Sequence, residues 1–130
     1  MTNIDREIAE KVMSWKYIQH EAKPYTEVDE DTGEKMELWF HFNPFYARPD
    51  MGNLSTDIWV PSTNIAQAME VIDKLVELGI KKISISYNAY LNPSDGNWIC
   101  DLEKQNIITR ARTKEMAICK AALKAVGSQK

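Results

Sequence analysis

The sequence predicts an α+β fold in which about three helices and one mainly antiparallel sheet form a layered sandwich. Apolar residues recur at helical spacing in three separate segments. Between these segments lie runs rich in β-branched and aromatic residues, and short turns of the kind found between antiparallel strands join the runs. The chain has 130 residues, which is the size of one domain, so we expect residues 1–130 to fold as a single unit.

The first predicted helix covers about residues 4–14. Apolar residues occupy one face at every fourth position, at Ile4, Ile8 and Val12. Asn3 has a side chain suited to cap the first turn, and Trp15 is expected to anchor the far end in the core.

Residues 16–42 predict a β-hairpin. An acidic, polar stretch with one glycine places the turn near residues 31–34. The returning strand, residues 36–42, is apolar on both faces from Leu38 to Phe42. An exposed apolar patch of this kind usually marks a contact with another chain, so we expect a homo-oligomer.

Two prolines and a glycine predict irregular structure over residues 43–57. The segment nevertheless carries Phe45, Tyr46 and Arg48, and long loops with such residues are often functional.

The clearest predicted helix covers residues 63–78, with Ser62 or Thr63 as its cap and Gly79 as its stop. Its apolar stripe is expected at Ile65, Met69, Ile72, Leu75 and Leu78, widened by Val71 and Val76.

The last third of the chain is expected to complete the sheet and add one helix. Strands are predicted at residues 80–91, 98–102 and 106–110, with a turn over residues 92–97. The final helix covers residues 114–126, and residues 127–130 form a tail.

Composition argues against several classes of function. The net charge of −3 and the pI near 5.4 do not suit general binding to duplex nucleic acid. No stretch is apolar enough to span a membrane, and the N-terminus lacks the apolar core of a signal peptide, so a cytosolic location is expected. Neither the two cysteines nor the two histidines have metal-ligand spacing, and we expect no metal or cofactor.

No catalytic constellation is evident, so we expect no enzymatic activity and assign no catalytic residue. There is no Gly-x-Ser-x-Gly motif, and Cys119 lies in an apolar helical run where a thiol is inert. His41 in its aromatic strand leaves a cryptic hydrolase as the weakest alternative.

The sequence does contain residues suited to a small anionic ligand. An arginine can grip phosphate with two hydrogen bonds, a tyrosine can stack on a base, and an asparagine can read base edges. The candidate ligand-binding residues are Arg48, Tyr46, Tyr90, Asn88, Arg110 and Arg112. Arg110 and Arg112 precede a helix start, where free backbone N–H groups favour anions. The alternative is that the aromatics fill the core and the arginines are ordinary surface residues.

Three segments, residues 5–15, 59–74 and 115–126, together resemble the phage ABA sandwich domain family. The most specific part is Trp59-Val-Pro-Ser-Thr-Asn-Ile65, which leads into the middle helix. The resemblance implies a small phage or prophage accessory protein that acts in the cytoplasm of a bacterial host. It transfers no catalytic residue.

Three functional hypotheses follow. The first is an oligomeric, non-catalytic sponge that sequesters a nucleotide signal of host immunity, an anti-defence role. The second is an inhibitor that binds a host protein through the aromatic loop and edge strand. The third is the hydrolase based on His41.

Overall fold

A computed structural model of the chain describes residues 3–49 and 51–127. The N-terminal half contains one helix and five strands: α1 (Ile4–Glu7), which continues into the π-helical turn η1 (Ile8–Val12), then β1 (Lys16–Ile18), β2 (Lys23–Val28), β3 (Lys35–Phe40), β4 (Phe45–Arg48) and β5 (Gly52–Ser55). The C-terminal half contains α2 (Ile65–Glu77), β6 (Ser84–Tyr87), the short 3-10 turn η2 (Pro93–Asp95), β7 (Trp98–Leu102), the 3-10 turn η3 (Glu103–Gln105), β8 (Ile107–Ala111) and α3 (Lys114–Gly127).

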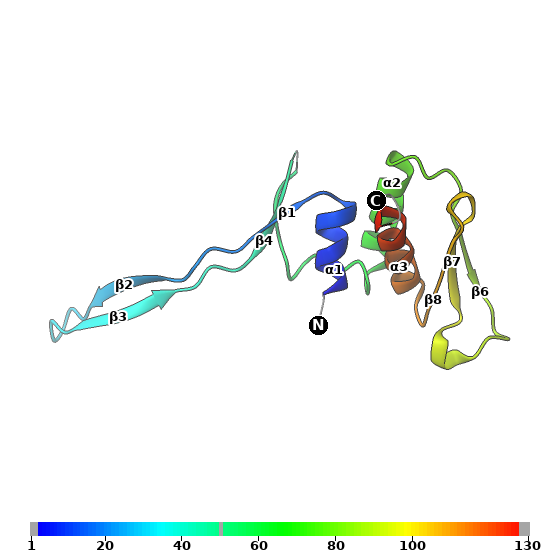
Figure 1. Cartoon of the computed structure of the whole chain (residues 1–130). Helices are drawn as coiled ribbons and strands as arrows, with labels where there is room; N and C mark the ends of the chain where they lie inside the picture. The colour runs from blue at the N-terminus through cyan, green and yellow to red at the C-terminus, as the bar shows by residue number, and fades with distance from the viewer. Residues whose placement is uncertain (1–2, 50, 128–130) are drawn as a thin grey trace.

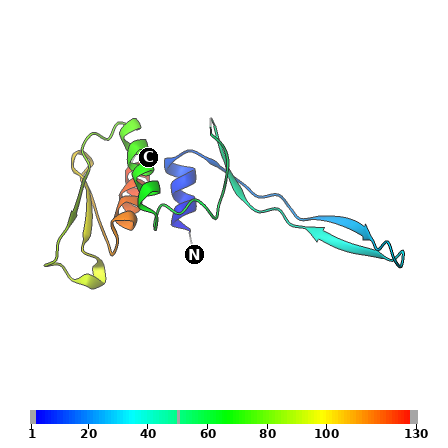
Figure 2. The ribbon, with the colours of Figure 1, turned by 180° about the vertical axis from the view of Figure 1, so that it is seen from behind.

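The strands form three small antiparallel sheets, with orders β1-β4-β5, β2-β3 and β6-β7-β8. Figures 1 and 2 show the helices between the β1-β4-β5 sheet and the β6-β7-β8 sheet, while β2 and β3 project far from both. The mixed α+β class is therefore confirmed, but the prediction of one sheet is wrong. Strand propensity is a local signal and does not say which strands pair with each other.

All three predicted helices are confirmed, although one of the predicted capping residues differs. Asn3 caps α1, since its Oδ1 accepts from the backbone N–H of Asp5 at 2.9 Å. The cap of α2 is Asn64 instead of Ser62 or Thr63, and its Oδ1 accepts from the N–H of Gln67. Of the predicted tail, Gly127 is the last residue of α3 and residues 128–130 lie outside the described residues.

The segment before α2 is held to α1. Trp59 is buried, and its Nε1 donates to the backbone carbonyl of Asp5 at 3.2 Å. The Asp5 carboxylate accepts from the N–H of Ser62 at 2.9 Å. The Gln67 amide bonds back to the backbone of Ile58 and Val60. These bonds explain why the Trp59–Ile65 motif and the first helix belong to one structural unit.

The buried face of α2 differs from the predicted stripe. Ala68, Val71 and Leu75 are buried, whereas Ile65 and Met69 are exposed. The helix contacts α3, whose buried side consists mainly of alanines. Small residues on α3 permit close approach of the two helices.

Residues 43–57 are not irregular, as the sequence suggested, because β4 and β5 form a hairpin there. Arg48 pairs with Gly52 at the end of this hairpin. Gly52 has a φ of 77°, a backbone conformation that glycine adopts without strain. The predicted strand over residues 80–91 is shorter, with ladder pairing at Ser84–Tyr87 only. The strands predicted at 98–102 and 106–110 are confirmed to within one residue.

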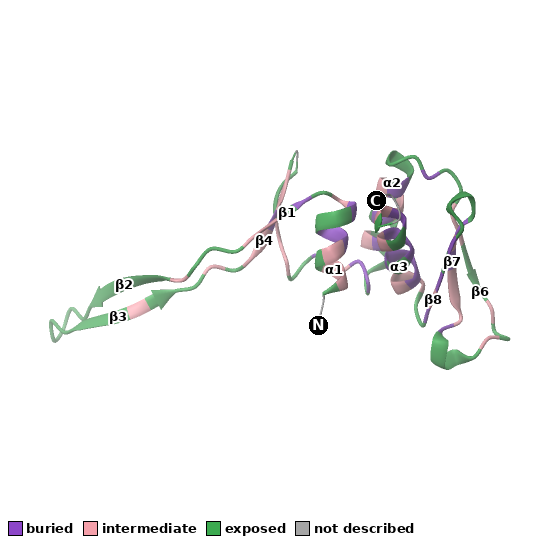
Figure 3. Cartoon of the chain, in the orientation of Figure 1, coloured by how far each residue is buried: buried purple, intermediate pink, exposed green. Residues whose placement is uncertain are grey.

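Residues 16–28 and 35–48 form one long two-stranded ribbon. The β1–β4 ladder pairs Lys16 with Ala47, and the β2–β3 ladder pairs Val28 with Lys35 in the same continuous register. Four residues on each strand separate the two ladders. We call residues 19–44, the part beyond the β1–β4 ladder, the arm. Figure 3 shows the β2–β3 part of the arm as almost entirely exposed, in contrast to the helical layer.

Candidate functional site

The arm has one strongly apolar face. Directly opposed residues of an antiparallel ladder project to the same side, and successive residues alternate. The pairs Lys23–Phe40, Tyr25–Leu38 and Glu27–Met36 therefore share a face. We call its four apolar side chains the apolar stripe: Tyr25, Met36, Leu38 and Phe40. Met36 is 54% exposed and Phe40 is 53% exposed, although both are side chains that normally lie in a core.

The opposite face of the arm is more polar. It contains Thr26, Lys35 and Glu37, together with Pro24, Val28 and Trp39, of which Val28 is 57% exposed and Trp39 is 60% exposed. The two faces thus differ enough to give the arm a defined binding side.

Charge also separates the arm from the rest of the chain. Seven carboxylates and two lysines give residues 19–44 a formal charge of −5, while the whole chain has −3. The remaining residues therefore carry +2. The hairpin tip concentrates acids, and Asp29 organises it, since its Oδ1 accepts from the N–H of Asp31 and its carbonyl accepts from the N–H of Gly33.

The root of the arm contains both histidines. His20 contacts the ring of Phe42 with centroids 5.6 Å apart, and His41 lies beside them at a cavity of about 330 Å³. Among the described residues, His41 has no hydrogen bond to a nucleophile or a carboxylate. The geometry therefore contains the histidine on which the hydrolase hypothesis rests, without the partners that a general base needs.

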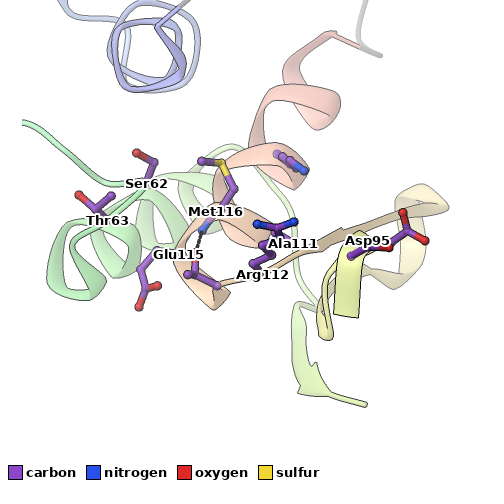
Figure 4. A pocket seen from close by; sticks show the side chains of 10 residues that line it. Ser62, Thr63, Asp95, Ala111, Arg112, Glu115 and Met116 are labelled. Carbon is purple, nitrogen blue, oxygen red and sulfur yellow. Dashed lines mark hydrogen bonds between the residues drawn. The ribbon is translucent and has the colours of Figure 1, made fainter. Parts of the chain in front are cut away.

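A second candidate site is a cavity of about 610 Å³ between the starts of α2 and α3. Ser62 and Thr63 line one side, Asp95 lines another, and Arg112, Glu115 and Lys120 complete it (Figure 4). Figure 4 shows the carboxylates of Asp95 and Glu115 directed away from the Arg112 guanidinium. Arg112 has no ion pair within the described part of the chain, whereas the Lys120 ammonium donates to the carbonyl of Arg110 at 3.2 Å.

The other two candidate arginines have structural contacts. Arg110 donates from Nε and Nη2 to the carbonyl of Gly96, at 3.1 and 3.0 Å. Arg48 donates to the carbonyls of Gly52 and Met51, both at 2.9 Å. Each guanidinium thus stabilises a turn and has fewer donors left for a phosphate.

The candidate tyrosines and the asparagine also differ in availability. Tyr46 is buried against Trp15, with centroids 6.1 Å apart, so it cannot serve as a stacking platform in this structure. Tyr90 is fully exposed, and its N–H donates to Oδ1 of Asn88 at 3.0 Å.

The six predicted ligand-binding residues do not form one site. Arg48 and Tyr46 lie in β4, on the β1-β4-β5 side of the helices, and the other four lie in or beside the β6-β7-β8 sheet. Sequence reasoning missed Lys120 at the cavity, and it missed the one-sided character of the arm. The second signal was visible in the alternation of Met36, Leu38 and Phe40.

The two cysteines are buried and unpaired, as expected for Cys119. Burial raises the pKa of Cys100 to about 11 and that of Cys119 to about 12, so both thiols are protonated at neutral pH. Within the described residues, no group of histidine, cysteine and carboxylate side chains is placed to hold a metal ion.

None of the described helices has the length and apolar character needed to cross a membrane. A family model described as the phage ABA sandwich domain matches residues 6–123. No curated protein and no solved structure matches the chain.

Proposed function

We propose that this chain, which belongs to the phage ABA sandwich domain family, is a non-catalytic binding protein that docks its arm onto another protein. Membership of the family supports a phage or prophage origin. In this proposal the protein works in the cytoplasm of the bacterial host, where it occupies a protein surface and converts no substrate.

The observation that carries the proposal is the apolar stripe. A two-stranded hairpin without a core is at best marginally stable in water, and three or more strands or a packed helix are needed to stabilise it. Among the described residues, β2 and β3 pack extensively only on each other, and Phe40 and Met36 stay more than half exposed although the Phe40 ring touches Phe42. A partner that covers this face would remove apolar area from water and hold the arm in place.

The charge of the arm indicates the character of the partner. With a formal charge of −5, the arm would be attracted to a surface with basic side chains around an apolar groove. Blocking such a groove on a host protein would be inhibitory. This is the host-protein hypothesis, and the arm favours it over the nucleotide sponge, because two of the three predicted arginines already bond to backbone carbonyls.

Photo-crosslinking from the arm tests the proposal. A benzoylphenylalanine at Leu38 lies in the stripe, and one at Glu37 lies on the opposite face of the same strand. In bacterial cells we expect one protein adduct from position 38, which disappears when Met36→Ser and Phe40→Ser are added. The matched control is Lys35→Ser with Glu37→Ser, which changes the other face and leaves the net charge unchanged. Equal adducts from both faces, or no protein adduct, would contradict the proposal.

A nucleotide sponge is the second candidate, and the cavity at Arg112 favours it. Its volume of about 610 Å³ is in the range of small-ligand sites, and Arg112 and Lys120 place two cations at its wall. Calorimetry with ADP-ribose and with a cyclic dinucleotide tests it. Binding should weaken about tenfold or more in Arg112→Ala, as expected for a lost charge-assisted hydrogen bond. If the wild-type protein binds neither nucleotide, the sponge hypothesis fails.

A further inference from the structure

A second apolar surface is left uncovered on α2. Ile65, Met69 and Val76 are exposed, and Ile72 between them is half-buried. Their spacing of three or four residues places all four on one stripe along the helix. The stripe spans about 16 Å at 1.5 Å per residue. Because the buried face of α2 is centred on Ala68 and Leu75, this stripe runs along its edge.

Strand β6 presents apolar residues that are likewise uncovered. Ile85 pairs with the buried Cys100, and Tyr87 pairs with Trp98, so both project to the inner face of the sheet that α3 covers at β7 and β8. Yet Tyr87 is 57% exposed, and Ile85 is also exposed. In addition, β6 is an edge strand, with β7 on one side only. Its other edge leaves backbone N–H and C=O groups able to pair with a further strand.

Both α2 and β6 lie on the side of α1 that faces away from the arm (Figures 1 and 2). The α2 stripe is distinct from the helix residues Glu70 and Lys74, which line a cavity together with Met13 and Trp15. We call Ile65, Met69, Val76, Ile85 and Tyr87 the acceptor face.

The arm of the same chain cannot cover the acceptor face. Figure 1 shows the arm leaving the molecule beyond α1, on the side opposite to β6, and pointing away from the helices. An occupant with the arm's properties must therefore come from another molecule.

We infer that the acceptor face binds the arm of a second copy of this chain, which pairs with the free edge of β6 and lays its apolar stripe over α2. The inference rests on the proposed docking function of the arm and names its partner. Pairing along the edge of β6 would extend a three-stranded sheet by the two strands of the arm. Two copies that exchange arms would cover both stripes and both acceptor faces.

The two surfaces match in length. The six paired residues of β2 and β3 extend about 17 Å at roughly 3.3 Å per residue, close to the length of the α2 stripe. A ribbon of this size can therefore cover the stripe from Ile65 to Val76 without leaving either end bare.

The two surfaces match in charge at the β6 end, while α2 itself carries Glu70, Asp73 and Glu77 against Lys74. The arm carries −5 and the rest of the chain +2, and Lys81 and Lys82 lie just before β6, where they would meet the acidic tip or its flanks. Lys82 pairs with Glu103 at 2.8 Å, whereas Lys81 has no ion pair among the described residues. Packing of one arm on another would instead bring −5 against −5, which is unfavourable at close range. Charge thus favours docking of an arm on the rest of another chain, which we call the body, over pairing of two arms.

Analytical ultracentrifugation of the full chain at 1–100 µM tests the inference with four proteins. These are the wild type, the stripe variant Met36→Ser/Phe40→Ser, the acceptor variant Ile65→Ser/Met69→Ser and the control Ile108→Ser. Ile108 is 60% exposed and pairs with Asp101 on the outer face of the same sheet, so its loss removes apolar surface away from the acceptor face. Met69→Gln is a second acceptor variant that keeps helix propensity, and circular dichroism establishes that each variant is folded.

We expect the wild type and the control to assemble beyond the 14.9 kDa monomer. The stripe and acceptor variants should each dissociate at least tenfold more readily, as expected for the loss of two buried anchors. An equimolar mixture of these two variants should regain assembly, because each then supplies the surface that the other lacks.

The outcomes separate the inference from the proposed function. A monomeric wild type at 100 µM overturns the inference, and the crosslinking experiment still decides whether the arm docks on a host protein. If the stripe variant loses assembly and both acceptor variants keep it, the arm docks elsewhere, so the inference falls and the proposed function stands. If neither the stripe nor the acceptor variants change assembly, the inference is also overturned.

Discussion

The body and the arm of this molecule are built from similar residues and held together differently. In the body, Trp15, Trp59 and Tyr46 meet in one buried aromatic cluster, and α3 covers β7 and β8 with a face of alanines. In the arm, Tyr25, Trp39 and Phe40 are exposed, and the ladder of β2 and β3 holds the segment together. The body thus buries a core within one chain, although the acceptor face stays exposed, whereas the arm has no core of its own.

The difference shows that apolar content alone does not define a core. A side chain stabilises the fold by the area that neighbours remove from water, and the arm has almost no such neighbours. Substitutions of buried residues in the body should therefore change the free energy of unfolding. Equivalent substitutions in the arm should change assembly.

The largest contrast is expected at two glycines with positive φ. Gly96, at φ 96°, faces β8, and a Cβ there would overlap the backbone of Ala111. We expect Gly96→Ala to destabilise the monomer by about 4 kcal/mol or more, because both the backbone conformation and the packing oppose it. Gly33 at the arm tip has φ 72° and open space around it, so Gly33→Ala should cost about 1 kcal/mol at most. Urea unfolding of both variants measures the difference. Equal losses in the free energy of unfolding would contradict the expected difference between body and arm.

A second contrast compares a core residue with a stripe residue. Leu75 is fully buried in the contact of α2 with the other helices, and Leu75→Ala should lower the free energy of unfolding by about 3 kcal/mol. Phe40→Ala removes a larger side chain but should cost less than about 0.5 kcal/mol in dilute solution, since Phe40 is mostly exposed there. Urea unfolding at submicromolar protein gives both values. A loss above about 2 kcal/mol for Phe40→Ala would mean that the arm is part of the monomer's core.

Much of this division between body and arm was predictable from the sequence. Where the prediction failed, the reason is physical. Caps and helical periodicity are local, so Asn3, Gly79 and the span of α3 were predicted well. The hairpin was predicted too, with its turn near residues 31–34, and the structure has the turn at residues 29–34. That it leaves the body depends on which strands share a sheet, a non-local property that propensity does not encode.

The candidate site was predicted less well. Periodicity identified an apolar face on α2, but the buried residues are Ala68, Val71 and Leu75, and Ile65 and Met69 are left uncovered. Arg48 and Arg110 are engaged by backbone carbonyls of turns, which no residue pattern reveals. Arg112 lines a cavity, and its role in ligand binding stays a prediction.

The cysteines give a smaller contrast, because they lie only in the body. Burial holds the pKa of Cys100 at about 11 and that of Cys119 at about 12, above the ordinary thiol pKa of about 9.0. The unfolded chain therefore loses these protons first as the pH rises. Stability is complete below about pH 9 and falls towards pH 11–12, by about 1.4 kcal/mol per thiol at pH 10.

Urea unfolding at pH 8 and pH 10 measures this loss. The difference between the two pH values should shrink by roughly half in Cys100→Ala, whatever that variant costs at pH 8. An unchanged difference would show that the thiols do not control the alkaline loss.

Amide hydrogen exchange, followed by mass spectrometry at several protein concentrations, tests the division of body and arm most directly. The ladder amides of residues 23–28 and 35–40 should exchange rapidly in dilute protein, because a lone two-stranded ribbon opens easily. They should become protected as concentration rises and arms dock, together with residues 84–87, while α3 stays protected throughout. Strong protection of the arm at the lowest concentration, equal to that of α3, would contradict the account, because the arm would then be stable without a partner.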